Sequence, residues 1–548
     1  MNIVYHLQQA FTTYLQSTFL LSDQELEPCN LALNADIQKQ QFGDFNSSAP
    51  LVLARLKKTK PQQIAQQIMQ EFSHPIIKKI ELAGAGFLNF FLTAEAFTQL
   101  AQELYVQQEL FFKPHQLKKR YINIEFVSAN PTGPLHFGHG RGAIIGDVLA
   151  NVLTFLGHSV VKEFYINDAG TQIQKLALSF LIRCQQILGL EAEIPEGGYH
   201  GEYLKTLAQT CVDQYGSAVL EESEAFFAEY AKKHLLANIQ QTLTKYRIHF
   251  DIWFSEKKLH ADGSIHKAID LLEHKGLTYY KDEALWFAST QFGDDKDRVL
   301  KKATGEWTYV AADVAYLKNK ADRTFDQLFM VLGHDHHSYA VRLQALRQAL
   351  DIKAALDVIL YQLVKIKEDG QEVRMSKRAG KIISLDDIIE TVGTDVARFF
   401  FLHRKADAQL DFDIELALKK TEENPVYYIQ YAYVRIKSIL TKAQDLYGTV
   451  PLLNTDPLLL HTDEHFLLKK IVSLQSILQT IQQNHQTHLL SYYLVELANA
   501  FHSYYAKNRI VDASDPAQSR SRLVIISLVQ KTLQIGLQLL GISTPDAM

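Results

Sequence analysis

The chain has 548 residues, more than one hydrophobic core usually holds, so three or four domains are expected. Apolar residues make up 47% and charged residues 21% of the sequence, a balance that excludes a disordered chain or a collagen-like fibre. Lys and Arg total 56 against 61 Asp and Glu, a net charge of -5, so any nucleic-acid binding must use local basic patches.

Targeting and redox signals are absent from the sequence. Lys39 is the first Lys or Arg, and no apolar run approaches the ~18 residues of a membrane span, so we expect a cytoplasmic protein that does not contact the membrane. The cysteines are odd in number and lack C-x-x-C spacing, which favours buried residues over disulfides or a thiolate zinc site. They are Cys29, Cys184 and Cys211.

The first elements predict a small α/β domain over residues 1–113. Val4, Leu7, Phe11 and Leu15 recur at helical spacing, and two short strands are expected on either side of the turn at residues 84–86.

The next domain is expected over residues 114–362. There the strand-like YINIEFV, a Pro/Gly loop, a helical pattern and the strand-like SVVKEFYI form a βαβ unit, which requires a parallel sheet.

Three further segments complete the expected organisation. Residues of about 171–250 read as a helical insertion into the α/β domain, and residues 363–422 as a connector. No convincing strand follows Glu423, so residues 423–548 predict a helical domain.

The densest chemical signal is EFVSANPTGPLHFGHGRG, residues 125–142, between the first strand of the sheet and its helix. His136 and His139 flank Gly138 where a helix begins, and free N–H groups and the helix dipole at such a position favour a phosphate. Two imidazoles there could hold a reacting α-phosphate. Either histidine alone would more readily be interpreted as a hydrogen-bonded structural residue.

Two other patterns compete with this interpretation. Gly140-x-Gly142-x-x-x-Gly146, with Glu163 on the next strand for a ribose hydroxyl, is compatible with a nicotinamide dinucleotide loop. The run VLGHDHH, residues 331–337, packs three His and one Asp together, but no distant ligand pair completes a metal site, so we expect no tightly bound metal.

The motif ANPTGPLHFGHGRG resembles the H-I-G-H region of class I aminoacyl-tRNA synthetases, in the form typical of the arginyl-tRNA synthetase family, with Phe137 in place of Ile. GQEVRMSKRAGK, residues 370–381, resembles the family's mobile K-M-S-K-S loop, with Arg374 at the first Lys and Arg378 where Ser is usual. Alone, such a charge run is usually a solvated surface. A cation on a loop that closes is suited to the β,γ-phosphates of ATP, and Lys377 is the candidate.

The resemblance implies two sets of residues at the nucleotide. Catalysis would rest on His136, His139, Ser376 and Lys377. ATP would contact Gly138, Gly140, Asp335, His336, Arg374 and Met375, where Asp335 and His336 match the family's G-A-D-H-H segment and His334 replaces its Ala.

A planar, permanently charged guanidinium favours several converging carboxylates, and the resemblance supplies them. Tyr309 and Asp313 match the family's Y-x-x-x-D pair, although by spacing alone they could simply belong to an amphipathic helix. Glu256, Glu125 and Asn130 match its other arginine contacts. Lysine should be rejected strongly, because its ammonium would leave buried acceptors unpaired.

The segment NPVYYIQYAYVRIKSIL resembles the family's anticodon-binding helix, which implies tRNA contacts at Tyr428, Tyr431 and Arg435, with Tyr433 where His is common. By spacing alone, a bundle core is the favoured position for Tyr427, Tyr431 and Arg435, although they could also offer planes to unstacked bases. The C-terminal LLGISTPDAM is similar to the family's C-terminus, which implies that Met548 lies near the anticodon loop. GFLNFFLT resembles the family's N-terminal domain, which implies a D-loop contact at Asn89.

The resemblance covers essentially the whole chain. It implies a Rossmann-type parallel-sheet catalytic domain with a helical insertion, a small α/β N-terminal domain and an all-α anticodon-binding bundle. The implied reaction activates L-arginine with ATP and Mg²⁺ and transfers it to tRNA(Arg), with activation requiring bound tRNA, in a monomer. The alternatives are a nicotinamide-dependent oxidoreductase, which leaves the histidines and Lys377 without roles, and a catalytically silent RNA-binding module, suggested by the altered RMSK loop.

Overall fold

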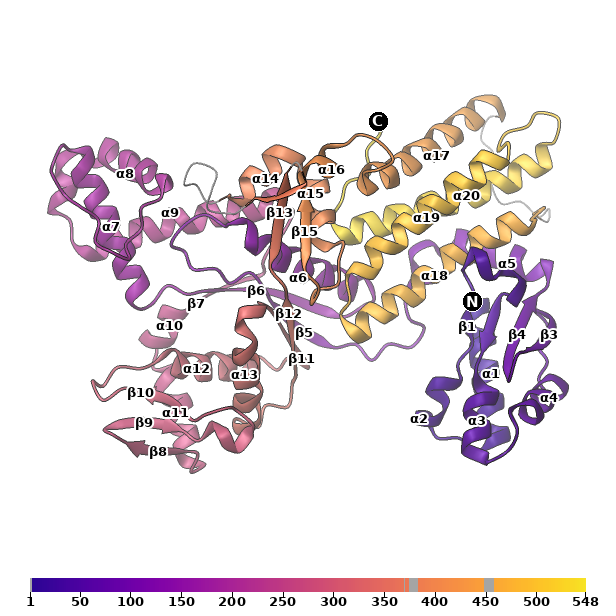
Figure 1. The fold of residues 1–548 in the computed structure, drawn as a ribbon, viewed down its shortest axis with the longest axis horizontal. Helices are drawn as coiled ribbons and strands as arrows, with labels where there is room; N and C mark the ends of the chain where they lie inside the picture. The colour runs from indigo at the N-terminus through magenta and orange to yellow at the C-terminus, as the bar shows by residue number, and fades with distance from the viewer. Residues whose placement is uncertain (1, 369, 374–382, 448–457) are drawn as a thin grey trace.

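The computed structural model describes residues 2–368, 370–373, 383–447 and 458–548 (Figure 1). Its N-terminal part is an antiparallel sheet of order β1-β2-β4-β3 packed against helices. The predicted apolar stripe of the first helix is buried, and strands flank the predicted turn. The elements are α1 (Ile3–Phe19), α2 (Asp23–Leu26), β1 (Ala32–Leu33), β2 (Phe45–Ser47), α3 (Ala49–Lys57), α4 (Pro61–Glu71), β3 (Ile77–Ala83), β4 (Phe87–Leu92) and α5 (Ala94–Gln107).

The centre of the molecule is the expected parallel sheet, whose five strands lie in the order β12-β11-β5-β6-β7. β5, the earliest strand of this sheet in chain order, is central; β6 and β7 extend the sheet to one side, and β11 and β12 to the other. Ligands bind at such a reversal, outside the carboxyl ends of the strands. The strands are β5 (Tyr121–Glu125), β6 (Ser159–Ile166), β7 (Ile252–Ser255), β11 (Gln327–Gly333) and β12 (Ala355–Tyr361).

Three crossover helices pack on this sheet, and two insertions extend from it (Figure 1). The crossover helices are α6 (Phe137–Phe155), α12 (Tyr309–Asp322) and α13 (His337–Ala349). The predicted helical insertion consists of α7 (Thr171–Ile187), α8 (Glu202–Tyr215) and α9 (Glu224–Lys245).

The second insertion was not predicted. It comprises α10 (Glu256–Ala261), α11 (Ser264–His274) and an antiparallel sheet of β8 (Thr278–Lys281), β9 (Ala284–Phe287) and β10 (Arg298–Lys301). Its strands have only four residues each, and β8 is largely exposed, so no apolar alternation marks them in the sequence.

The C-terminal part is helical, as expected. The connector places a small sheet beside α6, made of β13 (Val364–Glu368), β14 (Gln371–Val373) and β15 (Leu410–Asp413), with α14 (Leu385–Val392), α15 (Thr394–Leu402) and α16 (Ile414–Leu418). The bundle that follows contains α17 (Pro425–Tyr447), α18 (Thr462–Asn484), α19 (His488–Lys507) and α20 (Pro516–Leu540). No helix in the described ranges is both long and apolar enough to cross a bilayer.

A buried ion pair joins these parts. Arg398 on α15 and Asp147 on α6 are almost inaccessible to solvent, and the guanidinium lies 2.5 Å from the carboxylate. The same guanidinium donates to the main-chain oxygens of Tyr246, at the end of α9, and Leu540, at the end of α20. One side chain therefore fixes the insertion, the connector and the helical bundle on the histidine-bearing helix.

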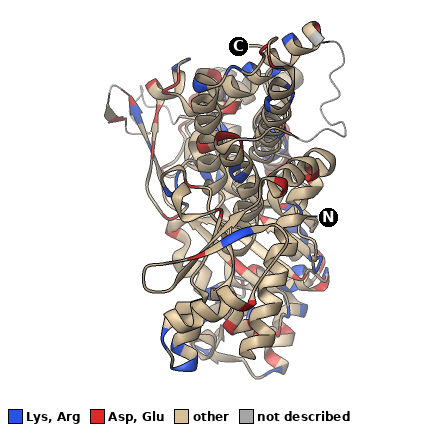
Figure 2. Cartoon of the chain, turned by 90° about the vertical axis from the view of Figure 1, so that its right-hand side faces the viewer, with Lys and Arg blue, Asp and Glu red and all other residues tan. Residues whose placement is uncertain are grey.

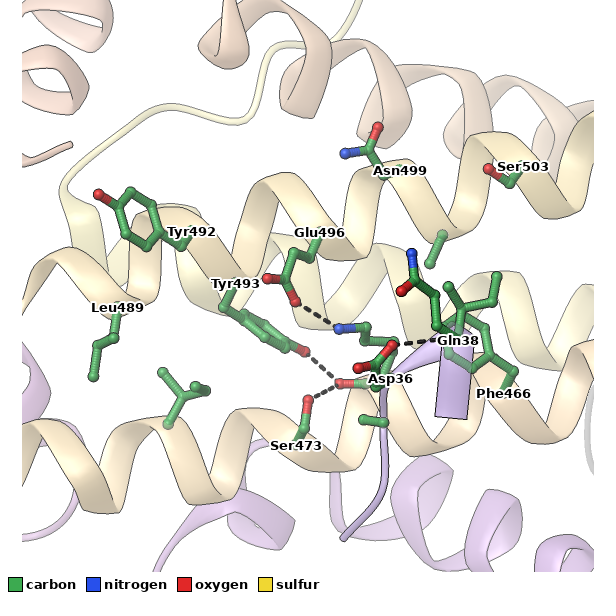
Figure 3. A pocket seen from close by; sticks show the side chains of 15 residues that line it. Asp36, Gln38, Phe466, Ser473, Leu489, Tyr492, Tyr493, Glu496, Asn499 and Ser503 are labelled. Atoms are coloured by element: carbon green, nitrogen blue, oxygen red, sulfur yellow. Dashed lines mark hydrogen bonds and ion pairs between the residues drawn. The ribbon is translucent and has the colours of Figure 1, made fainter. Parts of the chain in front are cut away.

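The N-terminal domain lies under the bundle, and a cavity of about 730 Å³ opens between them (Figure 3). Residues 35–38 line one side of this cavity, and α18 and α19 line the other. Lys470 on α18 and Glu496 on α19, both lining residues, form an ion pair of 2.6 Å. None of the lining residues belongs to the predicted sites.

Candidate active site

The two histidines lie where β5 gives way to α6. His136 is the N-cap residue of α6, and its Nδ1 accepts a hydrogen bond from the Gly138 N–H over 3.1 Å. The His139 Nδ1 in turn accepts from the His136 N–H over 3.2 Å, and the two rings lie 3.7 Å apart. This reciprocal capping fixes both rings at the carboxyl edge of the sheet.

The hydrogen bonds define the tautomer of each ring. A neutral imidazole whose Nδ1 accepts carries its proton on Nε2, so both rings present an Nε2–H donor. Burial lowers the pKa of both groups, and the neighbouring His136 adds to the shift of His139, whose pKa falls to about 3. Near neutral pH the pair is uncharged and can donate two hydrogen bonds to an anion.

The segment after the RMSK motif contacts this histidine loop directly. The Phe137 N–H donates to the Ile383 oxygen over 3.0 Å, and the Leu385 N–H donates to the Leu135 oxygen over 2.9 Å. The motif residues Arg374, Met375, Ser376 and Lys377 lie outside the described residues. Two regions more than two hundred positions apart in sequence are thus joined beside the imidazoles.

The other predicted nucleotide contacts differ in their surroundings. Gly138 lies against the His136 ring, whereas a Cβ at Gly140 would overlap the Phe401 ring and Leu385, so close packing also requires a glycine there. Asp335 and His336 follow β11 across the strand reversal, and both side chains are exposed.

The predicted acids converge on the same edge of the sheet from separate elements. Glu125 is the last residue of β5, Glu256 the first residue of α10 directly after β7, and Asp313 lies in the first turns of α12. Glu125 and Glu256 are 5% and 3% exposed. Their charges act on one another, because Asp313 shifts the pKa of Glu256 and Glu125 shifts the pKa of Asp313.

Two of the three acids lack a strong cationic partner in this structure. Burial raises the pKa of Asp313 to about 7, and a 3.6 Å contact with Arg342 offsets this only in part. Burial likewise raises the pKa of Glu256 to about 7; its carboxylate lies 3.7 Å from the His260 ring, which is a cation only when it is protonated. The pair forms a site that a guanidinium or ammonium ligand would complete.

Glu125 is different, because the protein already neutralises it. The buried Lys320 ammonium lies 2.9 Å from its carboxylate, and the Tyr316 hydroxyl donates to it over 2.8 Å. Sequence reasoning missed both residues. The available signal was spacing: Asp313, Tyr316 and Lys320 follow at i, i+3 and i+7, which places them on one face of α12.

The remaining predicted ligands of the amino acid contact the helical insertion. The Asn130 amide donates to the Gln172 side chain over 2.7 Å, and the Tyr309 hydroxyl approaches Gly170. Tyr309 is 55% exposed, one helical turn before Asp313. The start of α7 therefore borders the acid cluster, a neighbour that the sequence did not reveal.

The dinucleotide alternative fails on geometry. A Cβ at Gly142 or Gly146 would overlap Tyr361 or Phe126, so these glycines allow α6 to pack closely. Glu163, the expected ribose ligand, is fully buried and accepts two hydrogen bonds from Arg323 over 2.7 and 3.0 Å. It is not available to a ribose.

The predicted tRNA contacts on α17 form a partly exposed ladder of rings. The Tyr427 and Tyr431 rings stack at 6.2 Å, and the Arg435 guanidinium lies 4.4 Å from the Tyr431 ring and 5.0 Å from that of Tyr505. Tyr428 packs beside this ladder on His502, at 4.5 Å. These side chains are half-buried, so spacing alone did not distinguish a core position from a surface one.

The other two predicted tRNA contacts lie far apart. Met548 is 49% exposed, and the C-terminal segment is held on α17 by an ion pair of 2.5 Å between Lys437 and Asp546. Asn89 lies within β4 between two strands and is only 6% exposed.

Within the described residues no group of three or more His, Cys, Asp or Glu side chains is arranged to hold a metal ion.

Comparisons with known proteins agree along the whole chain. A family model described as tRNA synthetases class I (R), catalytic domain, matches residues 100–405. The arginyl tRNA synthetase N terminal domain matches residues 5–92, and the DALR anticodon binding domain matches residues 429–548.

Individual relatives point the same way. An arginine–tRNA ligase of Bacillus subtilis is 39% identical over 100% of both chains, and one of Syntrophotalea carbinolica is 42% identical over 93% of both. The arginyl-tRNA synthetase structure of Thermus thermophilus has the same fold, with a TM-score of 0.76 over 100% of both chains at 20% identity. The chain therefore belongs to the arginine–tRNA ligase family of class I aminoacyl-tRNA synthetases.

Proposed function

We propose that the crevice beside the histidine pair is where this arginine–tRNA ligase forms arginyl-adenylate, and that Asp313 and Glu256 bind the guanidinium of arginine. The observation that carries the proposal is the pair of acids with raised pKa values at the histidine edge of the sheet, where Glu256 is buried and the Asp313 side chain is 18% exposed. Their charge is compensated when a permanently cationic side chain enters. Tyr309 covers that side chain, and Asn130 binds the α-amino group, with Glu125 beside them.

In the first step the arginine carboxylate attacks the α-phosphate of ATP in line, and pyrophosphate leaves. The Nε2–H groups of His136 and His139 donate to the phosphate oxygens as negative charge develops. Lys377 acts on the β,γ-phosphates from the RMSK loop, where Ser376 is the other catalytic residue, and Arg374 and Met375 contact ATP. In the second step the terminal ribose hydroxyl of tRNA attacks the adenylate carbonyl, and AMP leaves.

ATP enters with Mg²⁺ as a co-substrate. Magnesium is usually held by substrate phosphates and water with few protein ligands, which fits an edge where Asp335 is the exposed acid beside His336. When bound, the ion neutralises charge on the leaving pyrophosphate. Gly138 adds no side chain at the start of α6, and Gly140 is the second glycine that we propose contacts ATP.

Arginine is selected over lysine by the placement of the acids. A guanidinium has donors on several edges and can reach carboxylates from α10 and α12 together, whereas one ammonium is a compact point charge. Lysine would leave a buried carboxylate unpaired, which costs ~2 kcal/mol or more.

In the side view, Lys and Arg are mixed with Asp and Glu over the surface (Figure 2). We therefore propose that tRNA is bound by small groups of residues and not by one broad basic surface. Tyr428, Tyr431, Arg435 and Met548 would bind the anticodon loop by stacking and charge. Asn89, buried in β4, would affect a D-loop contact through the position of that strand. The enzyme is further proposed to be a cytoplasmic monomer that activates arginine only with tRNA(Arg) bound.

His139→Ala should lower the kcat of tRNA charging by about 10²–10³-fold, because one donor to the developing phosphate charge is lost. The KM for arginine should change little. The control is His274→Ala at the exposed end of α11. Equal kcat values for His139→Ala and wild type would remove the histidine from catalysis.

The kcat/KM for arginine should rise with pH through about 7 and then level off. The empty site holds Asp313 and Glu256 with pKa values raised to about 7, so acid protonates the groups that must be charged to bind a guanidinium. Binding lowers both pKa values and releases protons, which calorimetry in buffers of different ionisation enthalpy measures. A flat profile between pH 6 and 8, without proton release, contradicts the assignment.

A charging assay with twenty amino acids and total tRNA should show arginine as the substrate. Absence of charging by the wild type would favour a silent RNA-binding module.

Asp313→Asn should reduce kcat/KM for arginine at least about 30-fold, equivalent to ~2 kcal/mol. The control is Asp322→Asn on the same helix, whose partner is the surface residue Lys318. Normal charging by Asp313→Asn would refute the proposed pocket.

Exchange of pyrophosphate into ATP should require tRNA(Arg) as well as arginine. Exchange at full rate without tRNA would disprove the requirement.

Arg435→Gln should raise the KM for tRNA about tenfold, because the stacking of a base on the Arg435 guanidinium and the tyrosine rings contributes ~1–3 kcal/mol. Lys281→Gln, in the second insertion, serves as the control.

A further inference from the structure

A tyrosine from a third helix holds one oxygen of the central acid. The hydroxyl of Tyr339, on α13, donates to Asp313 Oδ1 over 2.8 Å. Arg342, on the same helix, places a guanidinium nitrogen 3.6 Å from the other oxygen, Oδ2, which is too long for a hydrogen bond. Asp313 is therefore hydrogen-bonded to Tyr339, whereas its contact with Arg342 is only a long ion pair.

From this geometry, and resting on the proposed arginine-binding role of Asp313, we propose that Tyr339 is a positioning residue that keeps Oδ1 occupied and presents Oδ2 to the substrate guanidinium. Asp313 then supplies one acceptor, and Glu256 must supply another from α10. The substrate bridges two elements of the protein, an arrangement that a single ammonium cannot complete.

The same construction recurs in the other acids of the cluster. The Tyr316 hydroxyl lies 2.8 Å from Glu125 and 2.7 Å from Glu163, and these two carboxylates share its single proton. Glu256 interacts with the Tyr165 hydroxyl, a hydrogen bond that holds down the pKa of Glu256 against the larger effect of burial. Asp313 and Glu256 thus each have a tyrosine, and Glu125 shares Tyr316 with Glu163, so a phenol donor orients these acids without adding a competing charge.

The effect of the donor follows from the groups that face Asp313. These are Tyr339 and Arg342 from α13, Glu125 from β5, Glu256 from α10 and Tyr165 from β6. Burial raises the pKa of Asp313, while the Tyr339 hydrogen bond and then the Arg342 charge lower it. Without the hydroxyl, the carboxyl keeps its proton to higher pH and loses its fixed orientation.

The test compares Tyr339→Phe with Tyr279→Phe in charging assays with tRNA. Tyr279 is the matched control, because its hydroxyl donates to Asp297 over the same 2.8 Å in the second insertion. Tyr339→Phe should raise the KM for arginine about tenfold or more, the effect of a hydrogen bond to a charged group, and leave the KM for ATP unchanged. The acidic limb of kcat/KM for arginine should move to higher pH, and the preference for arginine over lysine should fall. Tyr279→Phe should change none of these.

Tyr339→Gln separates the donor from the ring, since it keeps a hydrogen-bond donor but not the aromatic packing. If the donor acts, Tyr339→Gln retains a pH limb nearer to the wild type than Tyr339→Phe does. An unchanged arginine KM and pH profile in Tyr339→Phe would overturn the inference, as would equal losses for arginine and ATP with a lowered melting temperature. Asp313→Asn run in parallel separates the two proposals: normal charging there refutes the arginine pocket itself.

Discussion

The parallel pairing of β5 with β11 is the constraint on which the site depends. The chain leaves these neighbouring strands towards opposite sides of the sheet, to β6 and to β12, so the loops that follow them diverge and leave a crevice. Met330 pairs with Glu125 in this register, which places the end of β5 beside β11. The histidines, Glu125, Glu256 and the HDHH segment lie at this edge because each ends or follows a strand of the sheet, whereas Asp313 reaches it from the first turns of α12.

Electrostatic asymmetry gives that crevice its chemistry. Lys320 and Tyr316 complete the charge and hydrogen bonds of Glu125, whereas Asp313 and Glu256 remain under-compensated. Burial keeps the histidines neutral, and because each Nδ1 accepts a capping bond, both rings carry their proton on Nε2. The carboxyl edge of the sheet therefore offers acceptors to a cation and donors to an anion.

Two buried arginines connect this chemistry to the remote domains. Arg141, on α6 two residues after His139, donates to main-chain oxygens of Gln362, Lys405 and Ala408 and so anchors the connector on the histidine-bearing helix. Arg398 joins the same helix to the end of the last helix of the bundle. Burial makes each guanidinium costly to leave unpaired, so these contacts hold the parts in one arrangement.

The sequence by itself determined the local facts of this protein. The βαβ unit, the helical C-terminal region, the helix of Tyr309 and Asp313 and the capping position of the histidines follow from periodicity and glycine placement, which act over a few residues. Only the tertiary structure decided which acids lack a strong cationic partner, that Glu163 is closed to a ribose, that Asn89 is buried, and that Tyr339 holds Asp313. Burial, and with it each pKa, depends on side chains that other elements bring to the same place, and these long-range contacts leave no periodic trace in the chain.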